Sequence, residues 1–494
     1  MFALPLVFAA LAPQAVPAEP PPAAAPAVTT EPSTAEPVAD APSAVPNLPF
    51  ERAVLDNGLT LIVHTDPQLP VVCVDLWYRT GVFDEERGKS GAARLFEHLM
   101  YQGSKHNPGD NHLKLLEGAG ASNIGGGAGL DATRYVECVP KHELELALWL
   151  EADRMSWLME VTDAAKIDEQ RRIIVGERRR AIDEAPYGAA HQALWQAIFP
   201  ADHPYRAGHY GVPAELDKLA LADAQAFFDR HSVPANATLV VTGDVTVDDA
   251  KRLVDKYFRS FPRIERAGTR SVPMPKLGAE VRLDLEDPRA PGTTVAVTFF
   301  TPPALQNGSA DIEVLAYLLG DGNASRLHQA LVVDGKLATS VRASLLGAAN
   351  VSVLTLEVTV RRGVNPDDVL NAVQAQLDLL QDLPPSTEEL ARAVATFEAR
   401  RLTSLRQLVG RAELLQTYQL FAGDAGFLQK DLARYHAVTP ESTLAAVNGF
   451  LTRERRAVLV VRPAGAPPAT PTSTPTPSAE PAPATAAPTA EGGS

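Results

Sequence analysis

The stretch Ser90-Gly-Ala-Ala-Arg-Leu-Phe-Glu-His-Leu-Met-Tyr-Gln102 is the starting point for interpreting this chain. Its apolar residues recur at i, i+3, i+4 and i+7, which predicts a helix with one face in a core. These residues are Ala92, Leu95, Phe96 and Leu99. Ser90 is the predicted N-cap. Arg94, Glu97 and His98 have helical spacing on another face, so their side chains should converge on one point.

This spacing resembles the inverted zinc-peptidase motif H-x-x-E-H, in which two His ligands bracket a general-base Glu. Glu97 falls at the base position and His98 at the second ligand position, but Arg94 stands at the first. Arginine is permanently charged and has no lone pair to offer a metal. At an effective dielectric constant of about 20, two unit charges about 4 Å apart interact by about 4 kcal/mol, and a dication roughly doubles this repulsion. We therefore expect zinc binding to be weak or absent.

Length and charge limit the possible functions. The chain has 494 residues, enough for two to four domains, and 45% of them are hydrophobic. A net charge of −15 argues against a nucleic-acid or anionic-membrane partner. No run reaches the roughly 18 apolar residues of a membrane span.

The two ends of the chain differ from its centre in composition. Residues 1–12 are apolar and precede small residues and prolines, as in a secretory signal peptide, although no Lys or Arg comes before them. We expect a periplasmic or secreted protein, with a cytoplasmic location as the alternative. Residues 13–48 and 464–494 are rich in Pro, Ala and Thr and are predicted to be disordered.

The remaining chain predicts an α+β fold in two weakly repeated halves, which we assign to residues 49–260 and 261–463. Asn57-Gly58 predicts a hairpin near the start. Each half ends with a helix, a short loop and an apolar strand, and two long helices precede the last strand. The helix predicted at 312–319 contains no His, so any metal site belongs to the first half.

Two further patterns allow more limited conclusions. The glycine-rich stretch 118–129 lacks the lysine of a phosphate-binding P-loop and does not connect a strand to a helix, which excludes that interpretation. Cys73 and Cys138 lie in strand-like runs. They are either two buried thiols or a disulfide, and the sequence leaves this choice open.

An ordered series of short blocks over residues 50–463 resembles the pitrilysin/insulinase family, which includes the mitochondrial processing peptidases. The blocks include Asp75–Gly81, Met100–Ser104, Asp131–Tyr135, Leu148–Met155, Glu177–Arg179, Pro186–Gly188, Thr242–Asp244 and Ser325–Gln329. The resemblance implies two structurally related α+β domains that enclose a clam-like chamber. It also implies pairing with another such subunit.

The resemblance assigns roles to individual residues. Glu97 matches the family's general base, His98 its second zinc ligand and Glu177 its distant third ligand. Arg411 and Tyr418 match an Arg/Tyr pair that binds substrate across the chamber in active relatives. Our hypothesis for Arg94 is that its guanidinium takes the place of the metal and pairs with Glu97 or Glu177.

Three functions follow from this reading. The first is a pseudoenzyme subunit that supplies Arg411 and Tyr418 to an H-x-x-E-H partner in a peptidase heterodimer; a homodimer is the alternative assembly. The second is an active zinc endopeptidase with an altered ligand set, which would use His98, Glu177 and an unforeseen third ligand. His106 and His112 are disfavoured as replacement ligands, because they lie in a Gly/Pro/Asp loop after the helix, where we expect both on the surface. The third is a structural or peptide-binding scaffold.

Overall fold

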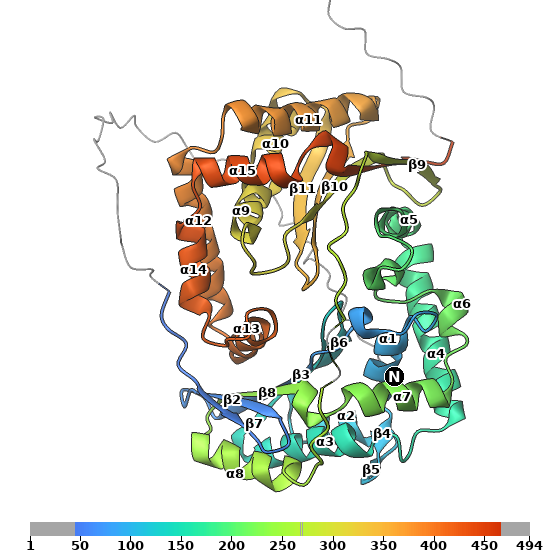
Figure 1. Cartoon of the computed structure of the whole chain (residues 1–494), viewed down its shortest axis with the longest axis vertical. Helices are drawn as coiled ribbons and strands as arrows, with labels where there is room; N and C mark the ends of the chain where they lie inside the picture. The colour runs from blue at the N-terminus through green and yellow to red at the C-terminus, as the bar shows by residue number, and fades with distance from the viewer. Residues whose placement is uncertain (1–44, 267, 269, 466–494) are drawn as a thin grey trace, which may run out of the picture.

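The computed structural model describes residues 45–266, 268 and 270–465, and these form two α/β halves (Figure 1). The N-terminal half contains a six-stranded sheet with the order β1-β2-β8-β3-β7-β6. Its strands are β1 (Glu51–Val54), β2 (Thr60–Thr65), β3 (Val71–Tyr78), β6 (Ser122–Ala128), β7 (Thr133–Pro140) and β8 (Ala237–Gly243). The pieces β4 (Gly103–Ser104) and β5 (Asn107–Pro108) pair with each other.

Helices cover one face of this sheet and form the larger core with it. They are α1 (Ala92–Leu99), α2 (Asn111–Gly118), α3 (Leu144–Trp157), α4 (Ala164–Arg178), α6 (Pro213–Leu216), α7 (Leu221–His231) and α8 (Val247–Phe258). The apolar stripe predicted on α1 is buried as expected: Leu95 and Leu99 are each 1% exposed. Helix α5 (Gly188–Ile198) lies elsewhere, beside the C-terminal half.

The C-terminal half contains a five-stranded sheet with the order β11-β12-β10-β13-β9. Its strands are β9 (Val281–Asp287), β10 (Thr294–Thr301), β11 (Ala338–Leu346), β12 (Ser352–Val360) and β13 (Arg456–Pro463). Its helices are α9 (Ser309–Gly320), α10 (Arg326–His328), α11 (Pro366–Asp382), α12 (Thr387–Ser404), α13 (Leu408–Phe421), α14 (Leu428–His436) and α15 (Pro440–Phe450). Five helices, α11 to α15, precede the last strand, where the sequence predicted two.

The two sheets repeat the same plan. The succession β2-β8-β3-β7-β6 corresponds to β9-β13-β10-β12-β11, and each step has the same strand direction in both sheets. The first pair is parallel and the other three are antiparallel. The predicted α+β fold of two related halves is therefore confirmed.

The halves exchange one helix each, which the sequence did not predict. Helix α13 lies on the second face of the N-terminal sheet, where Ala412 and Leu415 pack against Ile62 and Val240. Helix α5 lies on the C-terminal sheet, where it packs against β9 and β13 (Figure 1). Each sheet is therefore covered on one face by its own half and on the other by the opposite half.

Two local features settle or correct expectations from the sequence. The hairpin at Asn57-Gly58 forms as predicted, with Gly58 at φ 94°, a left-handed backbone that glycine adopts without strain. Cys73 and Cys138 are directly opposite each other on β3 and β7 and form a disulfide, which resolves the open choice.

The C-terminal boundary predicted for the disordered linker, residue 48, lies too far along the chain. Residues 45–48 belong to the ordered structure: Val45 is 3% exposed and packs in an apolar cluster of the C-terminal half. Alternation of Pro and small residues concealed this short apolar contact. The signal-like leader, the rest of the linker and the tail beyond residue 465 lie outside the described residues.

Candidate functional site

Helix α1 is anchored at its N-terminus by a buried carboxylate. Oε1 of Glu85 accepts hydrogen bonds from the backbone N–H groups of Gly91 and Ala93, each at 3.0 Å. Gly91 is the N-cap residue with φ 92°, so the prediction that Ser90 caps the helix is wrong. The Ser90 hydroxyl instead accepts from the N–H of Val212. The anchor fixes the helix that carries the three candidate site residues.

Arg94, Glu97 and Glu177 form a largely buried ionic cluster. Nη1 of Arg94 donates to Oε2 of Glu97 at 2.6 Å, and Nη2 donates to Oε2 of Glu177 on α4 at 2.7 Å. The three side chains are only 13%, 9% and 12% exposed. The prediction that the Arg94 guanidinium pairs with these carboxylates is confirmed, and it pairs with both.

His98 joins this cluster from the same face of α1. Its Nε2 lies 3.4 Å from Oε2 of Glu177, and its Nδ1 lies 3.2 Å from Oε1 of Gln170, which precedes Glu177 by about two turns of α4. The cluster is closed from two further sides. The N–H of Ala128 donates to Oε2 of Glu97, and the Tyr210 ring lies 5.6 Å from the Arg94 guanidinium carbon.

Electrostatics keep the central pair ionised. Burial disfavours the charged carboxylate of Glu177, but hydrogen bonds from His98 and Arg94 outweigh that effect and lower the pKa of Glu177 to about 2. The pKa of Arg94 is raised: burial opposes its charge, and the neighbouring Glu97 and Glu177 carboxylates more than compensate. At neutral pH the cluster therefore holds a permanent guanidinium cation between carboxylates.

These residues do not fit a catalytic zinc ion. Such a site needs three protein ligands and an open position for water. Here Arg94 stands at the first ligand position, and its guanidinium already engages the Glu177 oxygen that faces His98. Within residues 45–465, leaving out 267 and 269, no group of three or more His, Cys, Asp or Glu side chains is arranged to hold a metal.

The two histidines considered as replacement ligands lie elsewhere. His106 is 52% exposed and its Nδ1 bonds Asp153, while His112 is buried within α2 against the Tyr101 ring. Neither lines the cleft around Arg94. The expectation that both histidines lie on the surface is correct for His106 and wrong for His112, because α2 turns His112 inward.

A cleft of about 340 Å³ opens over the cluster. Its walls come from α1, from α4 and from the edge strand β6, where Gly125 and Gly126 stand in place of larger side chains. A Cβ atom added at Gly126 would lie 2.7 Å from the Tyr101 hydroxyl, so this strand passes too close to the tyrosine for a side chain. Apolar Leu113, Ile124 and Ile173 complete the lining.

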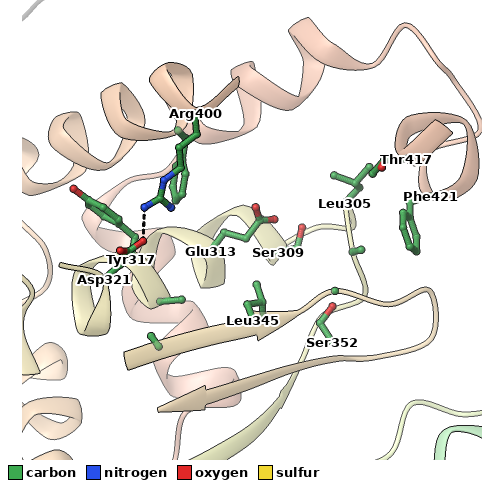
Figure 2. A pocket seen from close by; sticks show the side chains of 15 residues that line it. Leu305, Ser309, Glu313, Tyr317, Asp321, Leu345, Ser352, Arg400, Thr417 and Phe421 are labelled. Atoms are coloured by element: carbon green, nitrogen blue, oxygen red, sulfur yellow. Dashed lines mark hydrogen bonds and ion pairs between the residues drawn. The ribbon is translucent and has the colours of Figure 1, made fainter. Parts of the chain in front are cut away.

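The C-terminal half has a second cleft, of about 410 Å³, in the corresponding place (Figure 2). It lies between α9, α12 and β11, as the first cleft lies between α1, α4 and β6. Its lining includes Glu313 and Tyr317 on α9, and Arg400 forms a 2.5 Å ion pair with Asp321. As predicted, α9 contains no histidine.

Arg411 and Tyr418 are not brought to the Arg94 cleft. Arg411 donates to Asp66 on the N-terminal half and, through Nε, to the carbonyl of Leu405 at 2.6 Å. The Tyr418 side chain is 1% exposed, and its hydroxyl donates to the fully buried Asp431 at 2.7 Å. Both side chains are occupied by contacts within the protein.

Sequence reasoning missed several residues that build these arrangements. Gln170, which orients His98, lies seven residues before Glu177, and this helical spacing is the signal that would have connected the two. No such signal pointed to Asp66 or Asp431. Asp66 is 345 residues from its partner Arg411, and Asp431 lies on a different helix from its partner Tyr418, 13 residues away, so only the tertiary structure brings each pair together.

Comparison with known proteins agrees with this architecture. A family model described as "Insulinase (Peptidase family M16)" matches residues 60–203, and one described as "Peptidase M16 inactive domain" matches residues 218–397. The zinc protease PqqE of Helicobacter pylori is 25% identical over 386 residues, which cover 74% of this chain and 83% of that protein.

Two further relatives extend the comparison. The mitochondrial-processing peptidase subunit beta of Blastocladiella emersonii is 22% identical over 50% of this chain and 52% of its own length. The crystal structure of a protease from Helicobacter pylori superposes with a TM-score of 0.77 at 22% identity, and covers 84% of this chain and 100% of that one.

Proposed function

Because the chain belongs to the pitrilysin/insulinase family of peptidases, we propose that it is a non-catalytic member that binds peptides for a zinc-bearing partner. The observation that carries the proposal is the double ion pair of Arg94. Arg94 matches the position of the first metal ligand, and its guanidinium forms ion pairs with Glu97 and Glu177, the residues that match the general base and the third ligand. In this cluster Arg94 leaves an incomplete ligand set for zinc, and Glu97 is held in an ion pair rather than free to activate water.

The partner in this proposal is a subunit with an intact H-x-x-E-H motif. A relative of this chain is named as one subunit of a processing peptidase, which supports a paired assembly. We assign Arg411 and Tyr418 to substrate binding in that assembly. This assignment requires Arg411 to exchange Asp66 for a substrate group and Tyr418 to leave Asp431, so α13 must move first.

We also propose that the protein works outside the cytoplasm. The apolar leader supports export, and the Cys73–Cys138 disulfide supports an oxidising compartment. No helix within the described part of the chain is both long and apolar enough to cross a membrane.

Metal analysis of the purified chain, beside an Arg94→His variant, tests the non-catalytic role. We expect no zinc in the wild type and about one zinc per chain in Arg94→His, because histidine completes a three-ligand set. Arg94→Lys is the matched control: it keeps the positive charge without adding an imidazole, so it should bind no zinc.

Stoichiometric zinc in the wild type, lost in Glu177→Ala, would overturn the proposal and identify the chain as a peptidase in its own right. The partner role is tested with a co-purifying H-x-x-E-H subunit. Arg411→Ala should then lower the peptidase activity of the assembly. Unchanged activity would favour the scaffold function instead.

A further inference from the structure

We infer that residues 45–50 act as a strap that holds α13 on the N-terminal sheet and masks Arg411 and Tyr418. The inference rests on the proposed role of these two residues in substrate binding and adds how that role is controlled. The strap enters the described structure beside α14 and ends where β1 begins at Glu51, so it crosses from one half to the other (Figure 1).

The first anchor of the strap is Val45. Its side chain is 3% exposed and lies in the same apolar cluster as Tyr418. Its carbonyl accepts a hydrogen bond of 3.1 Å from Nε2 of Gln429 on α14. The other buried members of the cluster are Leu405, Leu414, Leu428 and Leu432. Val45 therefore helps to close the compartment that keeps Tyr418 from solvent.

The second anchor connects the strap to Arg411 through His64. Nδ1 of His64 lies 2.6 Å from the carbonyl of Pro49. Because a carbonyl can only accept, Nδ1 must carry the proton. Nε2 is then the acceptor of the neutral ring, and it receives Nη1 of Arg411 at 3.2 Å. Burial lowers the pKa of His64, and the charge of Arg411 lowers it further, which agrees with a neutral ring.

The middle of the strap joins two apolar clusters. Leu48 packs against the cluster that contains Tyr418 and also against the cluster beneath α13. Phe50 packs against this second cluster, in which Ala412 and Leu415 of α13 meet the sheet. The strap thus packs against both apolar clusters to which α13 contributes side chains.

These contacts make release of α13 depend on release of the strap. Moving α13 away while the strap stays would break the Arg411–His64 hydrogen bond and expose the apolar surface under Leu48 and Phe50. Displacing the strap first removes the Pro49 acceptor that fixes the His64 tautomer and uncovers the Tyr418 compartment. Local opening of α13 then costs less free energy.

Hydrogen exchange of the α13 amides tests the strap directly. The double variant Val45→Asp/Leu48→Asp should speed exchange across Leu408–Phe421 by about tenfold or more, while exchange in α8 stays unchanged. The matched control is Leu69→Asp, which adds a charge at an apolar side chain that is already 66% exposed. It should leave α13 unchanged.

A second version of the experiment disrupts the strap only after the protein has folded, so it avoids any effect on folding. A recognition sequence for a specific protease, placed between Pro49 and Phe50, allows the strap to be cut after the full chain has folded. Cutting should speed α13 exchange in the same way. Binding of a fluorescently labelled extended peptide, followed by anisotropy, should rise on cutting, and Arg411→Ala should abolish the gain.

The outcomes separate the two proposals. Unchanged α13 exchange, in both the variant and the cut chain, would overturn the strap. Faster exchange without any gain in peptide binding would support the strap and overturn the substrate-binding role of Arg411 and Tyr418. Faster exchange with a gain that depends on Arg411 supports both.

Discussion

Arg94 on α1 and Glu177 on α4 are joined by a 2.7 Å ion pair, at the two positions that the family resemblance matches to metal ligands. The same guanidinium reaches Glu97 at 2.6 Å, so one side chain forms ion pairs with two largely buried carboxylates. A metal ion would supply counter-charge only when bound, whereas Arg94 supplies its single positive charge permanently. The two helices are therefore held together by the chain itself, and this arrangement can be tested through stability.

Replacement of Arg94 by Leu should destabilise the protein strongly. It leaves Glu97 and Glu177 largely buried without their shared cation; breaking a fully buried ion pair costs about 3–5 kcal/mol, which is the upper limit expected here. The loss should shrink at acidic pH, where the stranded carboxylates can take up protons. Urea unfolding at pH 5 and pH 8 measures both effects. Arg52→Leu, at an exposed position on β1, is the control and should change stability by less than about 0.5 kcal/mol.

Glu177 should give the protein an acid-sensitive component of stability. Its pKa is about 2 in the folded protein, below the usual value of 4.5, so its contribution is complete above about pH 4.5 and is lost as the pH falls toward 2. The contribution is on the order of 3 kcal/mol. Glu177→Gln should flatten the dependence of unfolding free energy on pH in this window. An unchanged slope between pH 4.5 and 2 would contradict the assigned pairing.

Asp75 should give stability the opposite dependence on pH. The residue lies on β3, 2% exposed, and burial raises its pKa to about 8, although Arg134 opposes the rise. Because the unfolded chain ionises at lower pH, stability should fall as the pH rises from about 4 to 8. Asp75→Asn keeps the oxygen that accepts from Nε1 of Trp77 and cannot ionise. It should stabilise the protein at pH 8.5 and have little effect at pH 4, as measured by guanidinium unfolding.

Loss of the disulfide should weaken the N-terminal half. Cys73 and Cys138 are 65 residues apart, and cross-linking a loop of that size restricts the unfolded chain by roughly 4 kcal/mol in the chain-entropy model. Cys73→Ser/Cys138→Ser should lower the unfolding free energy by an amount of this order. Reducing agent should lower the wild type similarly and leave the double variant unaffected. A response of the double variant to reductant would show that the effect is not due to this bond.

Local patterns predicted the elements around the site well. Helical spacing placed Arg94, Glu97 and His98 on one face of α1, and Asn57-Gly58 predicted the first hairpin. Glu177 was different: it lies 80 residues after Glu97, so only the family resemblance connected it to the cluster. Its position beside Arg94 depends on how α4 packs on α1, which no local pattern records.

The contacts of α13 could not be predicted from the sequence. The apolar residues Ala412 and Leu415 predict that one face of the helix is buried, but not that it is buried on the sheet of the other half. Tyr418 and Arg411 were expected to face a substrate because the family resemblance matches them to an Arg/Tyr pair that binds substrate in active relatives. Asp431, from the following helix α14, contacts Tyr418, whereas Asp66 and the strap, which contact Arg411 and the surroundings of Tyr418, come from a distant part of the chain.

The exchange of α5 and α13 bears on how such a molecule could have arisen. A half-length ancestor with only one sheet would have had one apolar sheet face without a cover, since the covering helix belongs to the other half. Two copies that exchanged these helices would bury the second face of both sheets, and fusion of the copies would keep the exchange within one polypeptide. The present chain thus has the architecture of a domain-swapped dimer whose two halves are linked in one polypeptide. A fragment that ends near residue 260 should accordingly self-associate rather than stay monomeric.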